Sequence, residues 1–221
     1  SCTYLPDKVE RRLAADISSR PELHDTLAQA GFRRVENWVY KPACQDCHAC
    51  QPIRVVCSEF SQSRNMKRLV AKHADLTATV LEGALTDEHY DLFQRYLTSR
   101  HVDGQMGGMS KEEFSSMVEN SPISSLLIDY RDTEGVLLAS VLVDLQSDGL
   151  SAVYSFFEPD RPERSFGSFI ILDLINRVQQ SEAPYLYLGY YIAESRKMSY
   201  KARYTPFEIF HGGSWQRGSS L

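Results

Sequence analysis

The pattern of hydrophobic and polar positions predicts a chain of short strands and amphipathic helices. Apolar runs bounded by turn residues predict strands at residues 32–40, 53–57, 77–81, 125–130, 136–145, 150–158 and 185–192. Apolar stripes at helical spacing, with capping or stop signals, predict helices at residues 22–30 and 63–73, from 86, from 110, and at 165–180. A basic helix and a terminal strand pair follow. We therefore expect an α/β (α+β) fold with a mixed sheet flanked by helices.

The N-terminal part is expected to be a small β-rich unit that contains a cysteine turn. Residues 32–40 and 53–57 are predicted to pair as strands on either side of this turn, and a basic helix from Ser63 to His73 follows. We place this unit at residues 1–75 and a second unit at residues 76–221.

Turn residues also organise the second unit. Turns at residues 132–135 and 147–149 join three predicted strands into an antiparallel meander. The Gly-rich segment 104–109 lacks the spacing of a nucleotide-binding loop, so we interpret it as a flexible connection.

Composition narrows the functional classes. A chain of 221 residues with 43% hydrophobic residues can form a packed core. It contains no run of about 18 apolar residues, and its N-terminus lacks the basic-then-apolar pattern of a signal peptide. We therefore expect neither membrane insertion nor export, and we place the protein in the cytoplasm. A net charge of −5 argues against a general nucleic-acid coat.

Two basic islands interrupt this acidic chain. Residues 60–74 and residues 195–207 each carry four Lys or Arg and no acid. The simplest interpretation of either island is the solvated face of a helix. The alternative is that the islands contact anionic partners.

The cysteines are clustered, which indicates metal or redox chemistry in a cytosolic protein. Cys44, Cys47 and Cys50 form a C-x-x-C-x-x-C run, and thiolates at this spacing can converge on one ion. Candidates for a further ligand of a zinc ion or an iron–sulfur cluster are Cys2, Cys57 and His48. The set that we favour is Cys2, Cys44, Cys47 and Cys50. The alternative is a knuckle of reduced, partly buried thiols.

A third signal combines a strand, a loop with glycine and a helix. The predicted strand from Tyr154 to Glu158 is followed by Gly167 near the start of the next helix, where backbone N–H groups can receive an oxyanion or phosphate. A cationic segment follows within 40 residues and contributes Arg196, Lys197, Lys201 and Arg203. The combination indicates a transferase for anionic substrates.

The order of elements resembles the GNAT acyltransferases, in which two late strands splay apart around the acyl donor. Residues 164–169 lie where those enzymes carry the motif R/Q-x-x-G-x-G/A, and the chain has Arg164 and Gly167 there. It departs from the motif at Phe169, which stands at the final Gly or Ala position. This departure argues against binding of coenzyme A.

Five islands together resemble the aminoacyl-tRNA-protein transferases, more narrowly the bacterial aspartate/glutamate leucyltransferases. They are C-T-Y-L-P at residues 2–6, C-x-x-C-x-A-C-x-P-I-R at 44–54, F-x-x-S-R-x-x-K-R at 60–68, S-F-F-x-P at 155–159 and Y-Y-I-x-x-S-R-K-M-x-Y-K at 190–201. The resemblance implies transfer of leucine from leucyl-tRNA to an N-terminal Asp or Glu, which marks the protein for degradation. The donor is an activated ester, so no cofactor is required. The implied partners are leucyl-tRNA and such proteins, without a membrane.

This chemistry assigns candidate roles. An acidic acceptor needs fixed cations, for which the candidates are Arg196, Lys197, Lys201 and Arg203. Phosphates of the tRNA need basic side chains, and Arg64, Lys67 and Arg68 are available. The candidates for proton relay are Glu158, Asp173 and Tyr154, and the backbone N–H groups around Gly167 are candidates for oxyanion stabilisation. The apolar slot for the leucyl side chain is assigned to Phe156, Tyr187, Tyr190 and Tyr191, although alternation along a strand must turn some of them into the core.

Two other functions remain open at this point. A coenzyme A-dependent N-acetyltransferase would share the fold, but Phe169 and the basic helix count against it. A noncatalytic degron-binding or metal-sensing module could be built on the cysteine turn.

Overall fold

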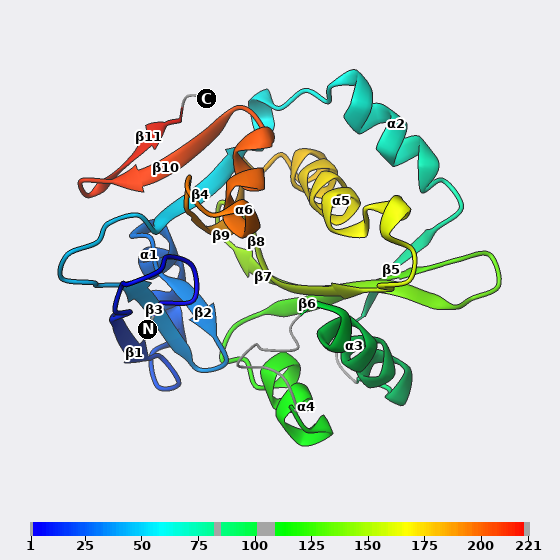
Figure 1. Ribbon diagram of the computed structural model, residues 1–221, viewed down its shortest axis with the longest axis horizontal. Coiled ribbons are helices and arrows are strands. Elements are labelled where there is room, and N and C mark those ends of the chain that lie inside the picture. Colours follow the sequence, from blue (N-terminus) through cyan, green and yellow to red (C-terminus); the bar gives the residue numbers. More distant parts are fainter. Residues whose placement is uncertain (1, 82–84, 101–108, 219–221) are drawn as a thin grey trace.

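The computed structural model describes residues 2–81, 85–100 and 109–218, which form a large mixed sheet, a small antiparallel sheet and the helices that cover them (Figure 1). The strands are β1 (Arg12–Asp16), β2 (Arg33–Val35), β3 (Trp38–Pro42), β4 (Gln51–Val56), β5 (Thr77–Leu81), β6 (Ser125–Arg131), β7 (Leu137–Gln146), β8 (Gly149–Phe157), β9 (Tyr185–Tyr191), β10 (Phe207–His211) and β11 (Ser214–Arg217). The helices are α1 (His24–Gln29), α2 (Arg64–Lys72), α3 (Asp87–Arg100), α4 (Lys111–Glu119), α5 (Phe166–Gln180) and α6 (Arg196–Ser199). Short 3-10 turns are η1 (Pro21–Leu23), η2 (Cys57–Glu59), η3 (Pro162–Arg164) and η4 (Tyr200–Arg203).

The large sheet has eight strands in the order β11-β10-β4-β9-β8-β7-β6-β5. β6, β7 and β8 pair in sequence as antiparallel neighbours, which confirms the predicted meander. β8 and β9 pair in parallel, and the intervening α5 makes the crossover that a parallel connection needs. The Gly-rich segment predicted to be flexible lies almost wholly outside the described residues.

Helices cover both faces of this sheet, as predicted. α5 and α2 lie on one face, and α3 and α4 lie on the other (Figure 1). The apolar stripe of α5, with Ile170 and Leu174, packs into the core that includes β4, β7 and β9. Phe93 and Phe114 pack with Phe156 in a second cluster on the opposite face. Within the described residues no helix combines the length and the apolar composition needed to span a bilayer.

Local signals set the helix starts where the sequence predicts them. The Ser63 side chain accepts a hydrogen bond from the N–H of Met66 at the start of α2. Ser110 and Glu113 form the reciprocal capping box at the start of α4. Because such caps involve only neighbouring residues, the sequence is sufficient to find them.

The predicted pairing of residues 32–40 with 53–57 is wrong. A left-handed residue, Glu36 (φ 49°), turns the chain so that β2 and β3 form their own hairpin, and β1 completes a small sheet in the order β1-β3-β2. β4 instead lies between β10 and β9 in the large sheet, with Ile53 to Val56 buried. A strand buried along its length belongs inside a sheet. The division at residue 75 stays a prediction, although β4 comes from its N-terminal side.

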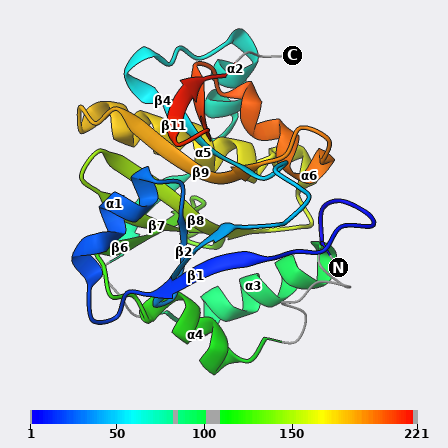
Figure 2. The same ribbon diagram turned by 90° about the vertical axis from the view of Figure 1, so that its left-hand side faces the viewer.

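A buried ion pair fastens the small sheet to the large one, which lies behind it in Figure 2. Arg34 on β2 binds Asp144 on β7 through Nε and Nη2, at 2.7 and 2.6 Å. Ser125 Oγ donates to the same carboxylate at 2.8 Å, and His24 Nε2 lies 3.7 Å from it. Burial lowers the pKa of His24, so this imidazole favours its neutral form. The pair holds β2 in a fixed position against the large sheet.

Candidate active site

The fork between β8 and β9 is the centre of the site. The two strands pair only where Gly149 to Ser151 lie opposite Tyr185 to Tyr187, and they diverge beyond this point. A Cβ on Gly149 would lie 1.8 Å from the carbonyl oxygen of Tyr185, so only glycine permits the close approach at the paired end. Beyond the fork a cleft of about 600 Å³ opens between β8, the start of α5 and the α6–η4 segment.

The start of α5 presents unsatisfied backbone donors to this cleft. Ser165 takes a left-handed conformation (φ 51°) and makes no side-chain cap. The first helical hydrogen bonds come from the N–H groups of Ser168 and Phe169 to Ser165 O, at 3.0 and 3.1 Å. The N–H groups of Phe166 and Gly167 therefore have no acceptor within the helix. Gly167 lines the cleft, and these donors and the helix dipole favour an anion or a developing oxyanion there.

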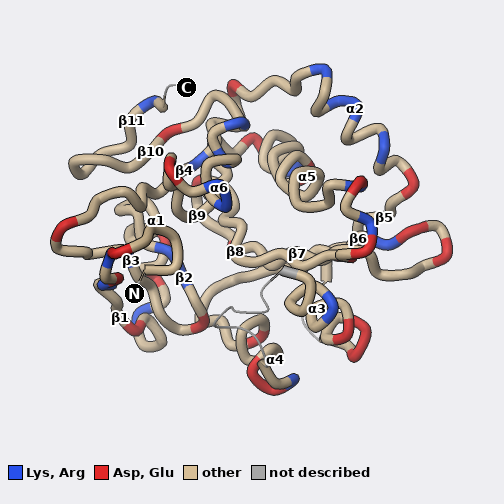
Figure 3. The backbone as a smooth tube through the Cα atoms, in the orientation of Figure 1, with Lys and Arg blue, Asp and Glu red and all other residues tan. Residues whose placement is uncertain are grey.

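The lining of the cleft is strongly basic. Six basic side chains line it, namely Arg33, Arg161, Arg196, Lys197, Lys201 and Arg203. Glu158 is the one acidic residue that lines it, among those described. The blue segments of α6 lie next to β8 and β9 in Figure 3. All four cations predicted from the cationic segment thus reach the cleft, and its electrostatics favour an anionic ligand.

Lys201 differs from the other three predicted cations because it is buried. Its side chain enters the interior beside β9, the residue is 6% exposed, and Nζ donates to Tyr190 O at 2.6 Å. Burial, followed by the charge of Arg33, lowers the pKa of Lys201 to about 7. At neutral pH this amine therefore exchanges readily between its charged and neutral forms.

Tyr154 lies on β8, Glu158 follows the last residue of that strand, and both line the cleft. The ring of Tyr154 meets Phe93 edge-on at 6.0 Å in the cluster that also contains Phe156, and its buried hydroxyl has no hydrogen-bond partner among the described residues. Burial, and to a lesser degree Tyr96, raises the pKa of Tyr154, so the phenol remains protonated and can donate. Glu158 accepts a hydrogen bond from Arg95 Nη2 at 3.0 Å.

Comparison with known proteins identifies the family. Residues 1–68 match the model for the N terminus of arginine-tRNA-protein transferases, and residues 88–211 match the model for the C terminus. The chain belongs to the arginine-tRNA-protein transferase family. A relative from Caulobacter vibrioides (strain NA1000 / CB15N), named aspartate/glutamate leucyltransferase, is 45% identical over 97% of this chain and 79% of its own length. A relative of the same name from Granulibacter bethesdensis is 43% identical over 97% of this chain and 81% of its own length. Another from Paramagnetospirillum magneticum is 42% identical over 98% of this chain and 89% of its own length.

Solved structures similar to this transferase share its fold. The structure of L-PGS from Bacillus licheniformis matches with a TM-score of 0.52 and 11% identity, over 86% of this chain and 52% of the other. The C-terminal domain of a putative lysylphosphatidylglycerol synthetase from Agrobacterium fabrum matches with a TM-score of 0.50 and 15% identity, over 78% and 52%. At these identities the likeness concerns the fold alone. The predicted GNAT-like mixed sheet and the family resemblance are confirmed.

The aromatic residues predicted to hold the aminoacyl side chain lie outside the cleft of this transferase. Phe156 belongs to the cluster under α3 and α4, because it faces the opposite side of β8 from its neighbours. Tyr187 donates to Asp148 at 2.8 Å, Tyr190 donates to Tyr40 O at 2.8 Å, and Tyr191 packs near Phe207. The apolar lining comes instead from Val141, Ala152, Phe157, Phe166, Ile170, Ile171, Leu174 and Leu188.

The packing of Phe169 explains why a large side chain stands at the Gly or Ala position of the acyltransferase motif. Its ring stacks on His73 at 4.1 Å between centroids and meets Tyr130 edge-on at 5.5 Å. Phe169 is 8% exposed and does not line the cleft. The side chain of Phe169 therefore packs α5 against the end of α2 in the core, and it does not obstruct the start of α5.

The predicted tRNA-binding island lies on α2. Arg64, Lys67 and Arg68 are exposed there and form no ion pair within the described part of the chain, and the blue segments along α2 mark them in Figure 3. At the other end of α2, Lys72 Nζ donates to Glu163 O at 2.7 Å, and Glu163 belongs to η3 beside the cleft. Lys72 thus joins the end of α2 to η3, whose first residue, Pro162, lines the cleft.

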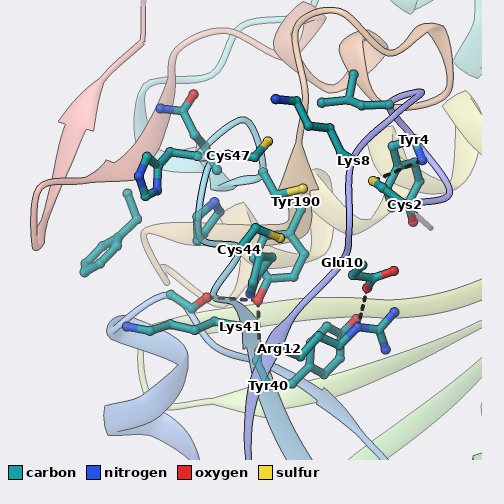
Figure 4. A pocket seen from close by; sticks show the side chains of 18 of the residues that line it. Cys2, Tyr4, Lys8, Glu10, Arg12, Tyr40, Lys41, Cys44, Cys47 and Tyr190 are labelled. Atoms are coloured by element: carbon teal, nitrogen blue, oxygen red, sulfur yellow. Dashed lines mark hydrogen bonds and ion pairs between the residues drawn. The ribbon is translucent and has the colours of Figure 1, made fainter.

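The four favoured cysteines line a second cavity of about 280 Å³ (Figure 4). Cys44 and Cys47 come from the loop before β4, and Cys2 comes from the N-terminal segment. Burial, followed by the other three thiols, raises the pKa of Cys50 to about 11. As these side chains stand, no three Cys, His, Asp or Glu in the described ranges are grouped to hold one metal ion. The donor set itself, four thiols around one cavity, suits zinc or an iron–sulfur cluster.

One cleft residue, Arg33, carries no signal in the sequence. It comes from β2, more than 100 residues away in the chain from the strands that it contacts. Neither hydrophobic periodicity nor a motif marks it, since its place depends on how the small sheet packs against the large one.

Proposed function

We propose that this transferase moves leucine from leucyl-tRNA to the N-terminal Asp or Glu of a protein, and so marks it for degradation. The observation that carries the proposal is the basic cleft at the fork, in a chain whose relatives are named aspartate/glutamate leucyltransferases. Both reactants are anionic, which suits such a lining. Leucine as the donor rests on the names of the relatives alone. Because aminoacyl-tRNA is cytoplasmic, we place the reaction in the cytoplasm.

The proposed reaction is an aminolysis of an ester. The neutral α-amine of the acceptor attacks the carbonyl carbon of leucyl-tRNA, a C–N bond forms, and the C–O bond to the terminal ribose breaks. The amine loses one proton and the ribose oxygen gains one. Since the ester is already activated, the reaction consumes neither ATP nor an electron carrier.

Within this proposal the chain supplies positions and donors. The N–H groups around Gly167 and the hydroxyl of Tyr154 donate to the carbonyl oxygen as it gains charge. Glu158 relays the proton between amine and ribose. Phosphates of the acceptor stem contact α2, and the leucyl side chain packs on Ile170 and Leu188. Arg196, Lys197, Lys201 and Arg203 attract the acidic acceptor.

A transfer assay tests the proposal. The protein is incubated with leucyl-tRNA and a peptide that begins with Asp, and mass spectrometry detects the Leu-extended peptide. Parallel reactions contain arginyl-tRNA or acetyl-CoA as the donor. No Leu-extended product, together with turnover of acetyl-CoA, would favour the acetyltransferase and end this proposal.

The substitution Tyr154→Phe is expected to separate catalysis from stability. Loss of one donor to the developing oxyanion should lower kcat about 100-fold with little change in KM. The same change removes a buried hydroxyl without a partner, so thermal stability should rise or stay equal. Steady-state kinetics and thermal unfolding measure the two effects. A variant with unchanged kcat would remove Tyr154 from the mechanism.

We also propose that Cys2, Cys44, Cys47 and Cys50 bind zinc or an iron–sulfur cluster. Such a group would join the N-terminal segment to the loop before β4, and the transfer reaction does not pass through it. Metal analysis and a visible spectrum of anaerobically purified protein should detect it, and Cys47→Ser should reduce the metal content to background. Metal-free, colourless and fully active protein would leave the thiols without this role.

A further inference from the structure

Arg33 occupies the gap that the diverging strands leave. Its Nη2 donates to Val153 O on β8, and its Nη1 lies against Gly189 on β9. A Cβ on Gly189 would lie 2.1 Å from Nη1, and Gly189 has a φ of +75°. Only glycine leaves room for the guanidinium at this point. The N-terminal sheet thus inserts a cation into the fork of the transferase sheet.

Lys201 brings a second cation to the same place from the C-terminal side. Its Nζ binds the carbonyl oxygen of Tyr190, the residue after Gly189. Arg33 is close enough for its charge to act on the Lys201 amine. Both side chains line the cleft, so they present a pair of cationic groups at one point of its wall.

These two cations have no counter-charge within the described residues. Neither forms an ion pair with a carboxylate, and the acid that lines the cleft, Glu158, is already bound by Arg95. A buried charge without a partner is costly, and a guanidinium has five N–H donors, of which the Val153 contact uses one. The arrangement therefore suits an anionic ligand that enters from the cleft.

We propose that Arg33 and Lys201 bind the side-chain carboxylate of the acceptor's N-terminal residue, and that Arg33 selects Asp and Glu over neutral residues. The inference rests on the proposed function and identifies the acceptor subsite within it. Lys201 is 6% exposed, so a small carboxylate on a short side chain reaches it more easily than a phosphodiester chain does. The exposed cations Arg196, Lys197 and Arg203 then steer the acceptor into the cleft.

The first experiment compares acceptors that differ only in charge. Peptides beginning with Asp or Asn are assayed with leucyl-tRNA, and Arg33→Gln should reduce kcat/KM for the Asp peptide about 10- to 100-fold while leaving the Asn peptide nearly unchanged. Arg33→Lys should recover part of the preference for Asp. Gly189→Ala, which displaces the guanidinium without removing it, should act like Arg33→Gln. The double variant should then be no worse than either single one.

Controls separate this inference from the proposed function. Arg20→Gln, at an exposed arginine paired with Glu22, should leave the Asp/Asn ratio unchanged. If the unmodified enzyme does not transfer leucine, the proposed function is wrong. If it does, and Arg33→Gln keeps the full preference for Asp, only the subsite is wrong. Reduced affinity of Arg33→Gln for leucyl-tRNA, with the preference for Asp intact, would assign the pair to the donor and overturn the inference.

The titration of Lys201 adds a second, independent readout. The probe is a peptide whose N-terminal Asp is replaced by a succinyl group, which keeps the carboxylate and lacks the α-amine. Because the pKa of Lys201 is lowered to about 7, the free enzyme loses this cation as pH rises from about 6 to about 8.5. The inhibition constant should then increase above about pH 7, by at most about tenfold per pH unit.

Lys201→Arg isolates the group responsible for this pH dependence. The charged and titratable groups that line the cleft with Lys201 are Arg33, Tyr96, Tyr154, Glu158, Arg161, Arg196, Lys197, Tyr200 and Arg203. All of them remain in the variant, whereas arginine keeps its charge over the whole range. A flat profile in Lys201→Arg is expected. The same slope in both proteins would exclude Lys201 from the subsite.

Discussion

Reversal of the three cations on α2 should nearly abolish the use of leucyl-tRNA. In the variant Arg64→Glu/Lys67→Glu/Arg68→Glu, three exposed cations that form no ion pair with any described residue become acids. Without their attraction for phosphates, and with the new repulsion, the affinity for leucyl-tRNA should fall by about two orders of magnitude at moderate salt. Filter binding at several salt concentrations measures this effect. The slope of log K against log salt should flatten by about 0.9 for each phosphate that the variant no longer neutralises.

The fold should tolerate this charge reversal. Ser63 still caps α2, and an acid at position 64 interacts favourably with the helix dipole. Transfer at saturating leucyl-tRNA should therefore recover a substantial part of the native rate. The double variant Arg20→Glu/Lys111→Glu, which reverses exposed cations on other elements, serves as the control and should bind leucyl-tRNA with a nearly native salt slope. Equal slopes in the triple variant and the native protein would contradict a tRNA-binding role for α2.

Loss of the buried carboxylate at Asp144 should destabilise the protein by about 3–5 kcal/mol. Asp144→Ala leaves the Arg34 guanidinium, whose side chain is 1% exposed, without its counter-charge, and also removes the acceptor of Ser125. Urea unfolding measures the change in the free energy of unfolding. The exposed pair of Arg20 and Glu22 provides the comparison, because its loss should cost less than about 1 kcal/mol.

A compensating double substitution tests whether the lost stability comes from the unpaired charge of Arg34. Replacing both partners, as in Arg34→Met/Asp144→Leu, removes the uncompensated charge and should restore most of the lost stability. Arg34 and Arg33 are adjacent on β2, so the ion pair also fixes the strand that delivers Arg33 to the fork. Asp144→Ala should therefore also reduce the preference for Asp over Asn acceptors. A destabilisation below about 1 kcal/mol would contradict the role of the pair as the fastening between the sheets.

Most secondary structure of this transferase could be predicted because its signals are local. The capping residues Ser63 and Ser110 and the apolar stripe of α5 involve only neighbours within a few turns. The partner of β4 could not be predicted, because every strand with an apolar pattern can pair with several others. The left-handed turn at Glu36 and the burial of β4 decided that pairing.

Part of the candidate site could be predicted from the sequence, and part could not. The start of α5 and the basic α6–η4 segment are each continuous in sequence, so Gly167 and the four cations that line the cleft could be predicted. The aminoacyl slot was assigned to aromatic residues that face elsewhere, since a sequence does not state which side of a strand meets the cleft.

The sequence by itself determined the family of this protein and most of its elements in their order, because periodicity, caps and motifs are properties of neighbouring residues. It did not predict β1, and it predicted β2 and β3 as one strand. The tertiary structure alone decided which charges lie together and which are buried. Arg33 enters the fork only because the Arg34–Asp144 pair holds β2 against the large sheet, and the pKa of Lys201 falls only because packing removes it from water. Both effects depend on interactions between residues that are far apart in the chain, and the electrostatics of the cleft follow from those interactions.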